Sequence, residues 1–277
     1  MVRRFRKPYR IRKKKSVFKI LFKSRLFWLI ILVLLIFGSA FYFLIFSTTF
    51  QIKKIQISGN QKIQTQDINN FLNQKINQKL FFQTKSVFLV NIKKIKNSFL
   101  ETFPQAEGIK VKRKLPSILV VQVQERSGVG AWCRGEDCYS IDRRGVIFEK
   151  VNEGYSFVIR FGNEKEPFLG EQILKENQME DILKIQENLT TKIKLTNKEF
   201  VLVNADRINV KTSEDWEIYF NLKENLDWQL TKLKLTLEKE IPLERRGSLE
   251  YIDLRFGNFV PFKYRGAQPQ GINQNSI

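Results

Sequence analysis

Cys133 and Cys138 are the two cysteines of this 277-residue chain, and they enclose the short segment RGED. On opposite strands of a hairpin that turns at Gly135-Glu136, the two thiols would lie at disulfide distance, and an exported location would permit their oxidation. Two free thiols or half of a metal site are the alternatives, but a metal site would need further Cys or His ligands. We predict a candidate disulfide that fixes a hairpin and stabilises the fold by at most about 2–3 kcal/mol.

The sequence contains few residues that could form a catalytic site. The chain contains no histidine, which excludes Ser-His and Cys-His nucleophile pairs, His-ligated zinc and imidazole acid–base catalysis. Carboxylates at Glu125, Asp142, Glu149 and Asp253 lie in strand-rich surroundings. Sugar hydrolysis needs a pair of carboxyl groups, one with a raised pKa and one that stays ionised. The residues around these four acids do not indicate such a pair. We therefore predict a protein that is not an enzyme, with no cofactor and no metal.

A run of large apolar residues near the C-terminal end is the strongest binding feature. If this hairpin forms the edge of a sheet, its unpaired N–H and C=O groups would template a strand from another protein. Pro261 removes one donor, and would either shorten this edge or protect it. The candidate partner-binding residues are Tyr251, Leu254, Arg255, Phe256, Asn258, Phe259 and Val260.

Charge and hydropathy divide the N-terminal part of the chain. The net charge is +20, and residues 1–25 hold 12 Lys or Arg and no acid. Residues 26–46 follow without a charge, and a helix of that length crosses a hydrocarbon core of about 30 Å. An uncleaved anchor fits better than a signal peptide, because the apolar stretch is too long for one. The positive-inside rule then predicts a cytoplasmic tail at 1–25 and export of everything after the span, so nucleic acid is not an expected partner.

Hydrophobic periodicity predicts two exported modules. In the first, residues 50–126, a strand at 51–58 precedes helices from Thr65 and from Ile92, then strands at 108–114 and 117–125. The second, residues 127–264, reads as mixed α/β on an extended, antiparallel-rich sheet, with helices at 171–189 and 226–238. Its predicted strands are 129–132, 138–142, 146–150, 157–160, 199–204, 208–212, 217–221, 249–256 and 259–264. The polar tail 265–277 is expected to be disordered.

Four motif regions, in a fixed order along the chain, resemble those of a known protein family. They are IKKIQISGN at 52–60, VKRKLPSILVVQVQER at 111–126, AW and YSIDRRGVIF at 131–148, and LEYIDLRF at 249–256. Behind a single anchor, these motifs resemble the FtsQ/DivIB family of bacterial cell-division proteins. The resemblance implies an α+β architecture: a transmembrane helix, a POTRA domain with the order β-α-α-β-β, and a β-rich C-terminal domain. It also implies that the last strands recruit a strand from an FtsB- or DivIC-like protein, with Phe256 as the matching aromatic.

The function that this resemblance implies is that of a bitopic cell-division scaffold in the cytoplasmic membrane at the division septum. Its expected partners are FtsB/DivIC-like and FtsL-like bitopic proteins, septal peptidoglycan synthases and membrane lipid. A POTRA-bearing outer-membrane assembly factor and a membrane-anchored cell-wall hydrolase are the alternatives. The basic face of the first module, from Lys93 to Lys114, either is simply solvated or meets anionic lipids, wall polymers or acidic partner segments.

Overall fold

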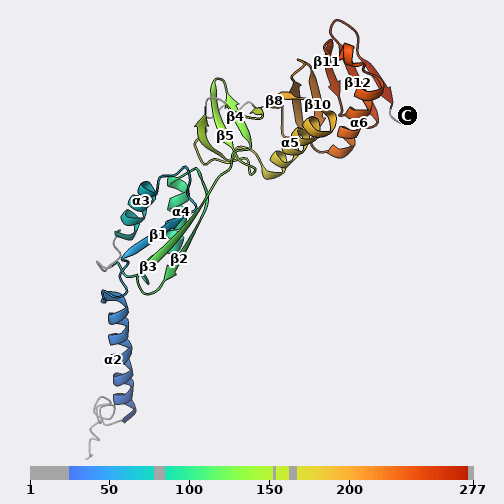
Figure 1. Cartoon of the computed structure of the whole chain (residues 1–277). Helices are drawn as coiled ribbons and strands as arrows, with labels where there is room; N and C mark the ends of the chain where they lie inside the picture. Colours follow the sequence, from blue (N-terminus) through green and yellow to red (C-terminus); the bar gives the residue numbers. More distant parts are fainter. Residues whose placement is uncertain (1–24, 78–84, 152–153, 162–166, 274–277) are drawn as a thin grey trace, which may run out of the picture. The chain divides into compact units, whose positions relative to one another are not determined.

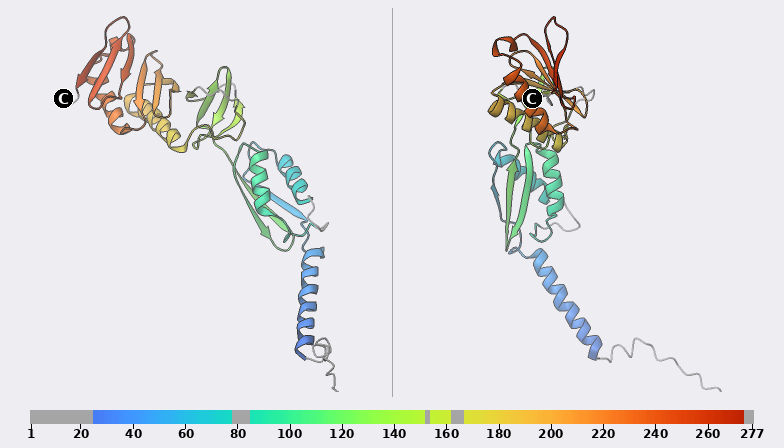
Figure 2. Two further views of the ribbon diagram at one scale, coloured as in Figure 1. Left: turned by 180° about the vertical axis from the view of Figure 1, so that it is seen from behind. Right: turned by 90° about the vertical axis from the view of Figure 1, so that its right-hand side faces the viewer.

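The computed structural model describes residues 25–77, 85–151, 154–161 and 167–273, drawn as ribbons in Figures 1 and 2. The basic tail predicted at 1–25 lies, except for Arg25, outside the described residues. The first element is helix α2, Arg25–Phe46, which agrees with the predicted span at 26–46. Its 22 residues include a window of mean hydropathy 2.9, and most of its large apolar side chains are exposed. At 1.5 Å per residue it is about 33 Å long, so by length and composition it suffices to cross a membrane.

The module that follows has the predicted order of strand, helix, helix, strand and strand. Its three strands form one sheet in the order β1-β3-β2 (Figure 1). In β3, Leu119, Val121 and Val123 are buried, which is the period-two pattern of a strand with one face on a core. The elements are β1 Lys54–Ser58, α3 Thr65–Asn77, α4 Ile92–Thr102, β2 Ala106–Lys114 and β3 Ile118–Glu125.

The rest of the chain builds a ten-stranded sheet in the order β13-β12-β11-β10-β9-β8-β7-β4-β5-β6. Pairing is mostly antiparallel, as predicted, with parallel pairs at β4–β7, β7–β8 and β10–β11. The strands are β4 Gly130–Arg134, β5 Asp137–Ile141, β6 Ile147–Val151, β7 Val158–Arg160, β8 Asn197–Leu202, β9 Arg207–Thr212, β10 Glu217–Asn221, β11 Leu249–Asp253, β12 Phe259–Tyr264 and β13 Gln270–Asn273.

Helices cover part of this sheet. They are α5 Glu176–Asn188, continued by a π-helical turn at Leu189–Ile193, α6 Leu226–Lys239 and the short α7 Leu243–Arg246. The buried side chains of α5 and α6 belong to the same hydrophobic core as those of the strands. This core includes Ile182 and Ile185 from α5, Leu230 and Leu233 from α6, and Trp132 and Phe220 from the sheet. The described fold is therefore the α+β architecture that the sequence predicts.

The β4–β5 hairpin brings together the two cysteines of the predicted disulfide. Cys133 and Cys138 lie directly opposite each other in the strand register and are bonded. The turn between the strands contains Gly135 with φ of +60°, a left-handed conformation that glycine adopts without strain. The bond thus joins two strands that the turn already brings together.

Two expectations need correction. Helix α5 begins at Glu176, five residues later than predicted, because the residues before it make strand-like contacts with another segment: Gln172 forms a bridge with Val146, and the N–H of Ile147 bonds the carbonyl of Glu171. The tail predicted to be disordered from 265 contains a strand, β13, which pairs with β12. Its polar sequence carries no apolar periodicity, and it is the open edge of β12 that organises it.

Candidate partner-binding edge of the C-terminal sheet

The candidate site is the hairpin of β11 and β12, with the connecting residues 254–258. One face of this hairpin is buried in the core through Leu249, Ile252, Leu254, Val260, Phe262 and Tyr264. Two aromatic side chains of the same hairpin are exposed, Phe256 by 52% and Phe259 by 45%. Exposed aromatic rings beside a strand edge are typical anchors of protein interfaces.

An internal ion pair fixes the start of the connecting segment. The guanidinium of Arg255 bonds both carboxylate oxygens of Asp253, at 2.8 and 2.6 Å, and its main-chain N–H bonds the same carboxylate at 3.1 Å. The Asp253 carboxylate is buried, and its hydrogen bonds raise the pKa of Arg255 above its ordinary value. A bidentate pair of this kind holds its geometry better than a lysine contact would.

Aromatic rings surround the same guanidinium. The centre of the Arg255 guanidinium is 5.5 Å from the ring of Tyr219 and 5.9 Å from the ring of Phe256, within the range of cation–π attraction. Tyr219 in turn stacks on Tyr251, with ring centroids 5.2 Å apart. Burial, followed by the charge of Glu217, raises the pKa of Tyr219 to about 12, so this phenol stays neutral near pH 7.

A buried lysine, Lys232, is hydrogen-bonded to the connecting segment 254–258. The side chain of Lys232, in α6, is fully buried, and its ammonium group donates to the carbonyls of Leu254 and Gly257, both at 2.7 Å. Burial lowers the pKa of Lys232, although the charges of Glu224 and Asp253 oppose this shift. Phe256 lies between the two bonded carbonyls in sequence, so Lys232 helps to fix the backbone that presents this ring.

Main-chain direction along β12 follows from two bonds at its ends. The N–H of Phe259 bonds the carbonyl of Phe256, and the N–H of Arg265 bonds the carbonyl of Ser248, so both point toward the β11 side. Successive residues of a strand point their main-chain groups to opposite edges, so Pro261 also faces β11, while Val260 and Phe262 face the other edge. The missing donor of Pro261 therefore does not interrupt the outer edge of β12. Pro261 neither shortens this edge nor protects it.

The outer edge of β12 is occupied by the chain itself. Strand β13 pairs antiparallel with β12, with Val260 opposite Ile272 and Phe262 opposite Gln270. The predicted binding mode depended on the last predicted hairpin forming the sheet edge, and in the structure β13 forms that edge instead. Nothing in the polar tail signals a strand, and only the pairing reveals it.

The seven predicted binding residues divide into three groups. Phe256, Asn258 and Phe259 are exposed, and Tyr251 and Arg255 are half-buried. Leu254 and Val260 are fully buried, so their side chains are excluded from direct contact with a partner, although the main chain of Val260 faces the outer edge. Lys232 and Tyr219 were not predicted from the sequence, because a lysine and a tyrosine within amphipathic patterns look like ordinary surface residues.

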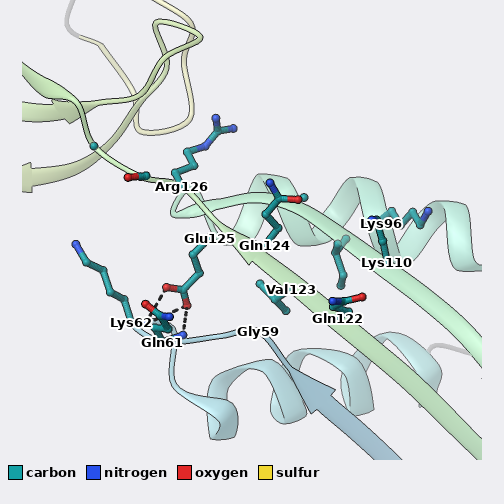
Figure 3. A pocket seen from close by; sticks show the side chains of 14 residues that line it. Gly59, Gln61, Lys62, Lys96, Lys110, Gln122, Val123, Gln124, Glu125 and Arg126 are labelled. Atoms are coloured by element: carbon teal, nitrogen blue, oxygen red, sulfur yellow. Dashed lines mark hydrogen bonds between the residues drawn. The ribbon is translucent and has the colours of Figure 1, made fainter.

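Three of the four carboxylates considered for catalysis make hydrogen bonds that hold the fold. Asp142 accepts hydrogen bonds from the N–H groups of Arg144 and Val146, both at 2.9 Å, and so closes a turn. Asp253 holds Arg255, as described above. The Glu125 carboxylate accepts from the N–H groups of three successive residues, Gln61, Lys62 and Ile63, at 2.8 to 3.1 Å. Figure 3 shows the bonds from Gln61 and Lys62.

Glu125 lies beside a groove of about 850 Å³, which Lys62, Lys96 and Lys110 also line (Figure 3). Burial works against the charge of Glu125, but the three backbone N–H groups outweigh it and lower the pKa of Glu125 below its ordinary value. Arg113, predicted as part of the basic face, instead donates to the carbonyls of Val87 and Val90. It therefore contributes to the fold of its module.

An apolar N-terminal helix, a β-α-α-β-β module and a strand-rich C-terminal domain, in this order, are the architecture of POTRA-domain proteins that begin with an apolar helix. Residues 50–126 match the family model "POTRA domain, FtsQ-type", and residues 130–255 match "Cell division protein FtsQ/DivIB, C-terminal". The chain belongs to the FtsQ/DivIB family of cell-division proteins.

Two curated relatives are both named cell division protein DivIB. The chain is 28% identical over 222 residues to the cell division protein DivIB of Clostridium tetani, covering 77% of this chain and 79% of that protein. It is 29% identical over 100 residues to the cell division protein DivIB of Clostridium acetobutylicum, covering 36% of this chain and 37% of that protein. The first of these matches extends over most of both chains.

Proposed function

We propose that this protein is a non-catalytic scaffold of cell division. It binds FtsB/DivIC-like and FtsL-like bitopic proteins outside the membrane, and through them it is linked to septal peptidoglycan synthesis. Helix α2 anchors it in the cytoplasmic membrane with its N-terminus in the cytoplasm. Membership of the FtsQ/DivIB family supports the assignment to cell division, and the charge of the N-terminal tail supports the orientation.

The observation that carries the partner-binding part is the geometry of β12. Its outer edge directs the main-chain groups of Val260 and Phe262 away from β11, and exposed Phe256 and Phe259 flank this edge. A partner strand in the place of β13 would make main-chain hydrogen bonds and aromatic contacts together. The bonds from Lys232 and Asp253 hold Phe256 in place before a partner arrives, which lowers the entropy cost of binding.

The Phe256→Ala substitution tests this proposal. It should weaken binding of the extracytoplasmic segment of the FtsB/DivIC-like protein from the same genome by about 30-fold, the loss typical of an interface hot spot. Binding is measured by titration with the full-length protein in nanodiscs. Leu243→Ala is the matched control, because Leu243 is 72% exposed on α7, outside the hairpin. Equal affinities for folded wild-type and Phe256→Ala protein would contradict the proposal.

Cell-wall hydrolysis is the enzymatic alternative from the sequence. A zymogram of the purified protein on peptidoglycan should show no cleared band. A cleared band that disappears when one carboxylate of the protein is substituted would contradict the scaffold assignment.

A further inference from the structure

The edge of β12 that the proposed function assigns to a partner is already paired with the chain's own C-terminal strand. Phe259, Val260, Pro261 and Phe262 lie opposite Asn273, Ile272, Gly271 and Gln270, respectively. A strand edge accepts one further strand, so β13 and a partner strand cannot occupy it together.

Short-range geometry favours the intramolecular pairing. Five residues separate the end of β12 from the start of β13, and the N–H of Ala267 bonds the carbonyl of Tyr264 at 3.1 Å within this connection. A connection this short gives the tail a high effective concentration at the edge, of the order of millimolar or more. A partner strand in solution must therefore compete with it.

The pairing also places β13 against one of the two exposed aromatic rings. A Cβ atom added to Gly271 would overlap the ring of Phe259, so this ring lies directly across the glycine of the neighbouring strand. Packing of an aromatic ring over a glycine in the adjacent strand is a known stabilising contact in sheets. The tail thus uses both the main-chain groups of β12 and one of its aromatic rings.

The tail is nevertheless a weak strand. It forms four residue pairs, and two of the four residues in its sequence QGIN, the glycine and the asparagine, have low strand propensity. A partner strand with β-branched or aromatic side chains would replace it at a gain in packing.

We infer that β13 is an intramolecular occupant of the partner-binding edge, and that a partner strand binds to β12 by displacing it. This inference rests on the proposed function and specifies how the same site is regulated. The tail then lowers the apparent affinity for the partner by the fraction of molecules in which the edge is free. Where the edge is free in about one molecule in ten, removing the tail raises the apparent affinity about tenfold.

The test compares three full-length proteins in nanodiscs with a truncated protein that ends at Gly266 and so lacks β13. The full-length proteins are the wild type, Ile272→Pro and Ser276→Pro. Proline at 272 removes the N–H that faces Val260, whereas proline at 276 places the same residue beyond β13. The first readout needs no partner: hydrogen exchange of the Val260 and Phe262 amides should be slow in the wild type and Ser276→Pro. It should be fast in Ile272→Pro and in the truncated protein.

The second readout is affinity for the extracytoplasmic segment of the FtsB/DivIC-like protein. Truncation and Ile272→Pro should each tighten binding by about threefold to tenfold relative to Ser276→Pro. Equal affinities, or equally fast exchange in all four proteins, would overturn the inference. Slow exchange that is lost on truncation, with no binding by any of the four, would overturn the proposed partner and with it the competition, while the β12–β13 pairing itself would stand.

Discussion

The ammonium group of Lys232 is buried and bonds two main-chain carbonyls that bracket Phe256. Lys232→Met keeps the length of the side chain and removes both bonds, leaving two carbonyls under-satisfied. Relief of the buried charge offsets part of this loss, so we expect the free energy of unfolding to fall by about 1–2 kcal/mol. Chemical denaturation measures it, with the exposed Lys239→Met as control. A stability equal to that of wild type would contradict the assigned role of Lys232.

Glu125 gives a pH-dependent prediction. Its pKa in the folded protein lies below the ordinary value of 4.5, so the folded state favours the carboxylate. The stability it contributes is present above about pH 4.5 and is lost as the pH falls through the lowered pKa. Glu125→Gln should therefore reduce the thermal midpoint at pH 7 and have a progressively smaller effect at lower pH.

The matched control for Glu125 is Glu101→Gln, because Glu101 is an exposed carboxylate on α4. Thermal unfolding of both variants at pH 7, 5 and 3 separates the two cases. If Glu125→Gln lowers the midpoint equally at every pH, the three N–H contacts to residues 61–63 do not depend on the charge, and the assignment fails.

Among the structural elements, the β4–β5 hairpin is joined by the Cys133–Cys138 disulfide. The loop that the bond closes is very short, so its removal costs only about 2 kcal/mol on the chain-entropy model. The double variant Cys133→Ser/Cys138→Ser should remain folded, with a free energy of unfolding lower by that amount, and should bind the partner segment normally. Loss of partner binding in this folded variant would show that the site extends beyond the β11–β12 hairpin.

Much of the element order could be predicted from the sequence, because alternating and helical apolar patterns mark β3 and α6 directly. The late start of α5 could not, since residues 170–174 are held by contacts with 145–147, far away in sequence. Strand β13 escaped prediction for a similar reason: its pairing depends on the open edge of β12 and not on its own composition. At the candidate site, Phe256 and Phe259 were predicted from the sequence as partner-binding residues and are exposed. The support from Lys232 could not be predicted, because it depends on how α6 packs against residues 254–257.

On the scale of the whole molecule, the net charge of +20 is concentrated toward the N-terminus, with 12 positive residues in 1–25. We predict that this segment stays in the cytoplasm and that the sheet domain is outside the membrane. In a Cys133→Ser/Cys138→Ser background, a membrane-impermeant maleimide should label Leu243→Cys in intact cells and should label Ser16→Cys only after lysis. Labelling of Ser16→Cys in intact cells would reverse the topology.

The central claim is that the edge of β12 receives a partner strand beside Phe256 and Phe259. The most direct measurement is photo-crosslinking in dividing cells, with a photoreactive residue at position 259 of the full-length protein and, as control, at position 243. We predict that position 259, and not position 243, captures an FtsB/DivIC-like single-span protein, identified by mass spectrometry. Capture of that protein from neither position, or equally from both, would contradict the claim.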